Sequence, residues 1–286
     1  MRVSRAHGAP ARMVLGGETI GLMVRAGMIR VAGLEIAYDR AGAGPPLVLV
    51  HGAAGDAREW GPQVAGLSDD FTVIAWDEPG AGRSSDVPAG FGLSGYALAL
   101  AGLVEAVGAP AHVCGSSWGG TVALELYHRR PELVAMLVLV DTYVGWKGSL
   151  TEHELRARVA GAERMLAAPA AVFRPTFPGL FAGEPPREVI ELLDAVATDV
   201  RSASLRVALG AIADADLRAV LPAIAVPTLL LWGELDARSP LSVAHEFARA
   251  IPHAELVVIP RAGHMTHLER PNEFTRAVRA FCRRHA

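Results

Sequence analysis

Seven short apolar runs alternate with helical patterns along this chain, and this alternation is the feature that most restricts its fold. The runs are rich in β-branched residues and span residues 34–39, 46–52, 71–77, 111–115, 135–141, 228–233 and 255–260. Four of them are almost continuously apolar, which is typical of strands covered by helices on both faces. Strands that alternate with amphipathic helices form βα units around a parallel sheet. The sequence therefore predicts an α/β fold with a mostly parallel sheet flanked by helices.

The alternation stops between residues 142 and 225, where the pattern is helical throughout. Thr151 and Glu154 form a capping-box pair at the start of one of these helices. Helices inserted between two core strands are typical of a lid over the sheet edge. We therefore predict a core of residues 28–141 and 226–286 and a helical cap of residues 142–225. Residues 1–27 precede the first clear strand periodicity and are predicted to form an N-terminal arm, flexible or loosely attached.

Composition argues against several classes of partner. The 286 residues are 51% hydrophobic, and their net charge of −3 is not gathered in blocks, which argues against nucleic-acid and membrane partners. Residues 1–27 lack the apolar run of a signal peptide. The most apolar segment, residues 95–110, is interrupted by a glutamate, a glycine and a proline, so it predicts a buried helix. We expect a cytoplasmic protein with a small-molecule substrate, and the sequence predicts no oligomeric state.

A glycine-rich junction, HVCGSSWGG at residues 112–120, places two serines between a predicted strand and a predicted helix. A serine in such a turn exposes its hydroxyl only if the residues two before and two after it are small, because the two backbones crowd there. Ser117 has Gly115 and Gly119 at these positions, whereas Ser116 has a cysteine and a tryptophan. The spacing therefore favours Ser117 as a nucleophile, and the next N–H, from Trp118, points toward an oxyanion. A merely structural or phosphate-binding turn is the alternative.

An acid and a base follow later strands. Asp236 comes just after the strand at 228–233, and His264 follows the strand at 255–260. All three side chains thus lie beyond the carboxyl ends of parallel strands, the edge at which α/β sheets build sites. A hydroxyl nucleophile needs a base, and the base needs an acid to orient it.

With these residues in this order, the chain resembles the α/β-hydrolase superfamily over residues 28–286. The resemblance is carried by HGAAGDAREW (51–60), DEPGAGRSS (77–85), the GSSWG turn, and the paired WGELD and GHMTHLERP segments. It implies a catalytic triad of Ser117, His264 and Asp236, and an oxyanion hole made by the backbone N–H groups of Ala53 and Trp118. Within the superfamily, the spacing is similar to that of small bacterial esterases, enol-lactonases and cofactor-free haloperoxidase-like enzymes.

The same resemblance implies that the segment 142–225 covers an acyl pocket. Its aromatic residues are candidates for the pocket lining, although such residues equally often form the interior of a cap; they are Trp146, Phe173, Phe177 and Phe181.

Other residues have competing interpretations. Asp141 also ends a strand and is an alternative acid for the triad. His267 and Glu269 suggest a metal site, but without a third ligand at suitable spacing we expect no metal and no other cofactor. His51 is expected to fix the oxyanion loop. Glu78 is expected to be a solvated loop carboxylate rather than a group at the pocket mouth.

The function predicted from these residues is a serine hydrolase that cleaves a carboxylic ester or lactone of a small or medium hydrophobic substrate through an acyl-enzyme. Carbon–carbon bond hydrolases and perhydrolases carry the same triad and stay open as alternatives. A ligand-binding protein with an intact triad and negligible turnover is the alternative of a different class.

Overall fold

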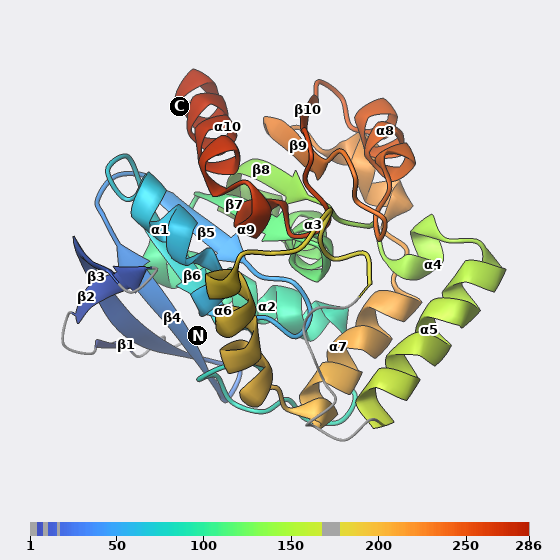
Figure 1. Ribbon diagram of the computed structural model, residues 1–286, viewed down its shortest axis with the longest axis horizontal. Coiled ribbons are helices and arrows are strands. Elements are labelled where there is room, and N and C mark those ends of the chain that lie inside the picture. The colour runs from blue at the N-terminus through green and yellow to red at the C-terminus, as the bar shows by residue number, and fades with distance from the viewer. Residues whose placement is uncertain (1–4, 8–10, 16–17, 168–177, 286) are drawn as a thin grey trace.

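The computed structural model describes residues 5–7, 11–15, 18–167 and 178–285, and within these ranges ten strands form one sheet (Figure 1). Strands β6, β5, β7, β8, β9 and β10 are mutually parallel neighbours, and the N-terminal strands add an antiparallel extension through β4. The strands are β1 Arg5–His7, β2 Ala11–Leu15, β3 Glu18–Val31, β4 Leu34–Ala41, β5 Pro46–Val50, β6 Thr72–Trp76, β7 Ala111–Ser116, β8 Val134–Val140, β9 Thr228–Gly233 and β10 Glu255–Ile259.

All seven predicted strands are present, each within two residues of its predicted ends. The N-terminal boundary needs correction, because strand β3 begins at Glu18 and not near residue 28. Residues 25–31 of β3 pair with residues 40–34 of β4, and Leu22 and Val24 pack against the core. Residues 18–27 therefore belong to the sheet rather than to an arm.

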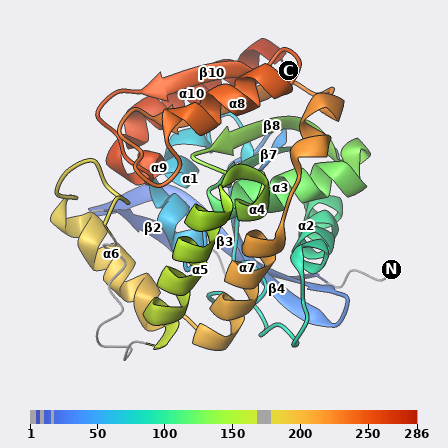
Figure 2. The same cartoon turned by 90° about the vertical axis from the view of Figure 1, so that its right-hand side faces the viewer.

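Helices cover both faces of the parallel strands (Figure 2). In β5, Val48 and Val50 face the cluster formed with α2, α3 and α8, while Leu47 and Leu49 face the cluster formed with α1 and α10. This alternation is the period of two that a strand imposes, and it explains why the central strands are apolar throughout. The covering helices are α1 Gly61–Leu67, α2 Leu93–Val107, α3 Trp118–Arg129, α8 Leu241–Ala250 and α10 Pro271–His285, with the short α9 Thr266–Glu269 before α10.

Between β8 and β9 the described residues form helices and no strand. These are α4 Trp146–Ser149, α5 Glu152–Ala167, α6 Arg187–Thr198 and α7 Ser202–Asp214. The predicted capping box is present, since Thr151 N–H donates to Glu154 Oε2 at 2.9 Å and Glu154 N–H donates to Thr151 Oγ1 at 3.3 Å. Helices α5, α6 and α7 lie along the lower side of the molecule in Figure 1. None of the described helices combines the length and apolar character needed to cross a membrane.

Candidate active site

Ser117 lies in the sharp turn between β7 and α3. Its φ of 51° is in the left-handed region, which residues other than glycine rarely adopt. A Cβ atom at Gly115 would lie 2.4 Å from the Gly119 carbonyl oxygen, and a Cβ atom at Gly119 would lie 2.3 Å from the Val50 carbonyl oxygen. Both positions therefore require glycine, and the strained turn presents the Ser117 hydroxyl at the carboxyl edge of the sheet.

Ser117, His264 and Asp236 form a continuous chain of hydrogen bonds. His264 Nε2 lies 2.9 Å from Ser117 Oγ, and His264 Nδ1 lies 2.8 Å from Asp236 Oδ2. Because the carboxylate accepts at Nδ1, the imidazole proton sits there and Nε2 is free to accept the serine proton. Asp236 Oδ1 accepts the backbone N–H groups of Arg238 and Ser239 at 2.7 and 2.9 Å, which fixes the carboxylate plane.

Asp141, the alternative acid, makes a different set of contacts. Its Oδ1 accepts the N–H of Gly233 at 2.8 Å, and its Oδ2 accepts the hydroxyl of Thr266 at 2.6 Å. Burial and the neighbouring Asp236 charge raise the pKa of Asp141 well above its usual range. Its carboxylate therefore ties the ends of β8 and β9 to the loop that follows β10, and the histidine partner in the structure is Asp236.

Ala53 and Trp118, the residues predicted to supply oxyanion donors, line the cavity that contains Ser117. Trp118 opens α3, and the first N–H groups of a helix have no acceptor within it. Ala53 is inside a turn closed by a 3.1 Å bond from Gly55 N–H to the Gly52 carbonyl, which does not use the Ala53 N–H. Neither N–H group is used by these hydrogen bonds, and the oxyanion hole stays a prediction.

His51 holds this turn in place. Its Nε2 accepts the N–H of Glu78 at 3.1 Å, so Nδ1 carries the proton and donates to the Gly52 carbonyl at 2.8 Å. Burial lowers the pKa of His51, and the ring therefore stays neutral. This arrangement agrees with the expected role of fixing the loop.

Glu78 is buried, so the prediction of a solvated carboxylate is wrong. The residue is 4% exposed, and its Oε2 accepts the indole N–H of Trp118 at 2.6 Å. Burial raises the pKa of Glu78 to about 8. The loop after β6 folds against α3, and this contact carries the carboxyl group away from solvent.

A second buried acid, Glu59, borders the cavity and was missed by the sequence analysis. Both carboxyl oxygens lie 2.7 Å from the point where a Cβ atom of Gly55 would be, so the glycine makes room for them. Burial, followed by the nearby Asp56, raises the pKa of Glu59 to about 8. The one available signal was a glutamate in the first turn after HGAAGD, a position that gives no indication of burial.

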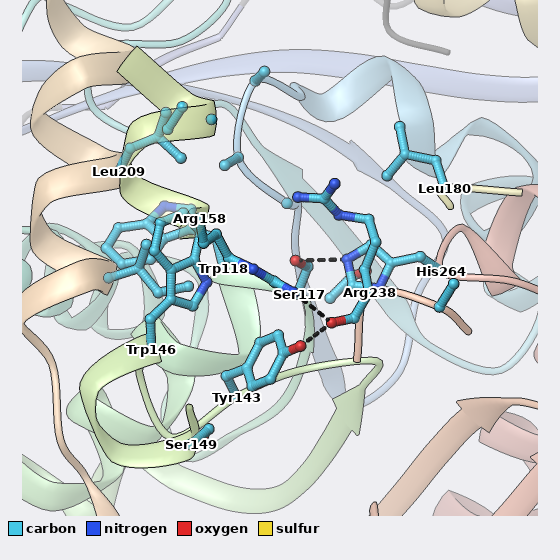
Figure 3. Close-up of a pocket in the computed structure, with 18 of the residues that line it drawn as sticks. Ser117, Trp118, Tyr143, Trp146, Ser149, Arg158, Leu180, Leu209, Arg238 and His264 are labelled. Carbon is cyan, nitrogen blue, oxygen red and sulfur yellow. Dashed lines mark hydrogen bonds between the residues drawn. The ribbon is translucent and has the colours of Figure 1, made fainter. Parts of the chain in front are cut away.

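The cavity that holds Ser117 and His264 has a volume of about 700 Å³, within the usual range for small-molecule sites (Figure 3). Its wall combines loops at the carboxyl edge of the sheet with residues of the helical segment 142–225. Apolar and aromatic members of that segment include Tyr143, Trp146, Leu150, Leu193, Leu205 and Leu209.

The four aromatic residues proposed for the pocket have different outcomes. Trp146 lines the cavity, whereas Phe173 and Phe177 lie outside the described residues. For Phe181 the prediction is corrected, because the chain turns just before it and the neighbouring Leu180 lines the cavity instead. Phe181 packs against a small separate cluster of Val189, Leu193 and Leu268.

His267 and Glu269 are not arranged as metal ligands. The His267 ring is buried 4.5 Å from the Trp60 ring, and burial lowers the pKa of His267 to about 3. Glu269 accepts the N–H of Ala182 at 2.7 Å and that of Gly263. Across the described ranges, no three His, Cys, Asp or Glu side chains are grouped so that they could hold a metal ion.

Comparison with known proteins matches residues 47–278 to the alpha/beta hydrolase family. The chain belongs to this family. The sheet order and the elbow at Ser117 are consistent with the match, because α/β hydrolases place a nucleophile on this strand–turn–helix junction.

This α/β hydrolase is 33% identical over 245 residues to the dihydrolipoyllysine-residue acetyltransferase component of the acetoin cleaving system of Pseudomonas putida. That match covers 85% of this chain but 64% of the relative, less than two thirds of its length. This chain is also 31% identical over 247 residues to a proposed carbamate hydrolase, RutD, of Pseudomonas syringae pv. syringae. That match covers 83% of this chain and 93% of the relative. A thermophilic esterase from Thermogutta terrifontis has a similar structure, with a TM-score of 0.78, 28% identity and 99% of each chain covered.

Proposed function

We propose that this α/β hydrolase is a serine esterase that cleaves carboxylic esters, lactones included, of small or medium-sized substrates. The observation that carries the proposal is the hydrogen-bonded Ser117–His264–Asp236 chain, which opens into a cavity of about 700 Å³. The esterase with a similar structure supports the reaction type. The helical segment 142–225 would act as a cap that shapes the substrate-binding cavity.

The mechanism follows from the positions of the protons. Ser117 Oγ attacks the ester carbonyl carbon while His264 Nε2 takes the hydroxyl proton. The imidazolium is stabilised by Asp236, and the tetrahedral oxyanion is stabilised by the N–H groups of Ala53 and Trp118. The carbon–oxygen bond to the alcohol then breaks, and the leaving oxygen receives the proton from His264. Water repeats these steps on the acyl-enzyme, which releases the acid and restores the serine.

The test is a set of initial rates on chromogenic esters of increasing acyl length, with a lactone and a carbamate included. We expect wild type to show a chain-length optimum and Ser117→Ala to lose activity roughly 10⁴-fold or more. Ser116→Ala is the matched control, because Ser116 is the neighbouring serine in the same cavity wall but takes no part in the hydrogen bonds that join Ser117, His264 and Asp236. We expect it to stay within about tenfold of wild type, a change too small for loss of a nucleophile.

The rival functions give distinct results. A folded wild type that reacts with a fluorophosphonate at Ser117 but hydrolyses no ester, lactone or carbamate would contradict the proposal. Multiple turnover on a substrate whose carbon–carbon bond is cleaved would then identify a carbon–carbon bond hydrolase. Peroxide-dependent oxidation would identify a perhydrolase. Saturable binding without turnover would identify a ligand-binding protein.

A further inference from the structure

Two arginine side chains border the same cavity as Ser117, and they come from different parts of the chain. Arg158 lies on α5 in the helical segment, and Arg238 follows β9, two residues after Asp236. Figure 3 shows both side chains beside the Ser117–His264 pair. Both are half-buried, so a ligand in the cavity can reach them.

Arg158 is held in place by the wall of the cavity. Its Nη2 donates to the Arg238 carbonyl at 3.0 Å, and its guanidinium carbon lies 5.3 Å from the centre of the Tyr143 ring and 5.6 Å from that of Trp146. Tyr143 also donates its hydroxyl to the Arg238 carbonyl. The guanidinium group is therefore positioned by a carbonyl and two aromatic rings, and it forms no ion pair with any residue that the structure describes.

No carboxylate neutralises this pair of arginines. In the described part of the chain neither Arg158 nor Arg238 forms an ion pair, and the remaining residues include no Asp or Glu. Arg83 shows the contrast, since it pairs with Asp77 and Asp39, each at 2.7 Å. Burial and the nearby Arg158 lower the pKa of Arg238, and together they outweigh the opposite effects of Tyr143 and Asp236.

Carboxyl groups in the cavity wall do not take over this role. Glu154 is exposed one helical turn before Arg158, and its charge acts on Arg158 without forming an ion pair; Glu246 is exposed on α8. Glu59 is the buried one, and because its pKa is raised to about 8 it is largely neutral at pH 7. Asp236 is the remaining acid beside Arg238, and its carboxylate is bonded to His264 and to two backbone N–H groups, so two guanidinium groups stand against one buried carboxylate near the serine.

We propose that Arg158 and Arg238 form an anion subsite, so that the substrate of this enzyme is an ester carrying a carboxylate or phosphate group besides the bond that is cleaved. The inference rests on the proposed esterase function. A guanidinium group offers several N–H donors in a plane that matches carboxylate and phosphate oxygens. Two such groups in a partly dry cavity attract an anion more strongly than they would in water.

The test compares two esters of the same shape that differ in charge, 4-nitrophenyl hydrogen adipate and the neutral 4-nitrophenyl adipamate. We expect wild type to prefer the carboxylate ester by about tenfold or more in kcat/KM, the size of a charge-assisted hydrogen bond. Arg238→Gln should reduce this ratio about tenfold, Arg158→Gln should reduce it in the same direction, and Arg238→Lys should retain part of it. Arg156→Gln is the matched control, because Arg156 is exposed on the same helix and pairs with Glu152; it should leave the ratio unchanged.

A second measurement separates the subsite from the esterase function. Labelling of Ser117 by a fluorophosphonate needs no turnover, so we would measure how adipate and inorganic phosphate slow it in wild type and in Arg238→Gln. If an anion slows the labelling of Ser117 in wild type, and at least several-fold less in Arg238→Gln, the subsite is supported even when every ester proves inert. The anion that protects better shows whether the subsite prefers a carboxylate or a phosphate group. Equal kcat/KM for the two esters, with no protection by either anion, would overturn the subsite while ester hydrolysis still stands.

Discussion

The parallel strands and the helical segment 142–225 hold their side chains in different ways. Strands β5, β6, β7 and β9 are buried along their whole length or nearly so, and the loops that follow β7, β9 and β10 carry a hydrogen-bonded serine, aspartate and histidine. Helix α5, by contrast, has no buried residue, and α6 buries only Val189, Leu193 and Val196. We therefore propose that the core carries out the reaction, and that the helical segment, through Arg158 and Trp146, acts with Arg238 of the core to set selectivity.

The largest expected effect comes from removing the carboxylate that orients the histidine of the core. Asp236→Asn keeps the shape of the side chain but no longer stabilises the imidazolium or selects its tautomer. We expect kcat on esters to fall roughly 10³- to 10⁴-fold, with the fold retained. The measurement is steady-state kinetics together with far-ultraviolet circular dichroism.

Asp141→Asn serves as the matched control, because Asp141 ends the neighbouring strand and bonds to Gly233 and Thr266 instead of the histidine. Its kcat should fall by much less than that of Asp236→Asn. If Asp141→Asn abolishes activity in a folded protein while Asp236→Asn stays near wild type, the assignment of the acid is wrong.

A second prediction compares the stability of the core and of the helical segment by making the same valine-to-alanine substitution once in each. Val138 in β8 is 0% exposed and Val159 in α5 is 37% exposed. Val138→Ala should lower the free energy of unfolding by about 2 kcal/mol or more, from two buried carbons and the cavity they leave. Val159→Ala should stay within about 0.5 kcal/mol of wild type, because alanine favours the helix and little packing is lost.

Denaturant titration of both variants measures these values. Equal losses at the two positions would mean that the helical segment unfolds together with the core and shares its packing. The proposed division between the two regions would then not extend to stability.

Sequence information was sufficient where the signal is local. Ser117 was selected by two glycines at fixed spacing, and Asp236 and His264 by their places after two strands, because the carboxyl ends of parallel strands share one edge. The start of β3 had a signal, since residues 20–24, IGLMV, form a short apolar run bounded by Thr19 and Arg25.

Packing decided what the sequence did not show. No spacing relates Arg158 to Arg238, which meet only because α5 lies against the loop after β9. Glu78 was misassigned for the same reason, because its partner is the indole of Trp118, 40 residues away. A loop carboxylate is solvated by default, and only the fold reveals an exception.

A further comparison concerns how the core responds to pH. Glu78 has a pKa of about 8 when folded and an ordinary one when unfolded, so between these values the folded protein keeps a proton that the unfolded chain releases. Stability is therefore unaffected below the unfolded pKa and falls as pH rises toward 8. Glu78→Gln keeps an acceptor for the Trp118 indole but has no charge. At about 1.4 kcal/mol per unit of pKa shift, we expect its free energy of unfolding, relative to wild type, to rise by roughly 3–4 kcal/mol between pH 5 and pH 8.5.

Glu154 in the helical segment provides the opposite sign. It is exposed, and hydrogen bonds from Thr151 lower the pKa of Glu154, so its contribution is present above its unfolded pKa and is lost as pH falls through the folded value. Glu154→Gln should therefore differ most from wild type at neutral pH and converge with it in acid. Urea titrations at several pH values test both variants. If the free energy of unfolding of Glu78→Gln depends on pH in the same way as that of wild type, the Glu78 carboxyl is ionised in the folded protein. The buried acid in the core and the exposed acid in the helical segment would then not differ in sign.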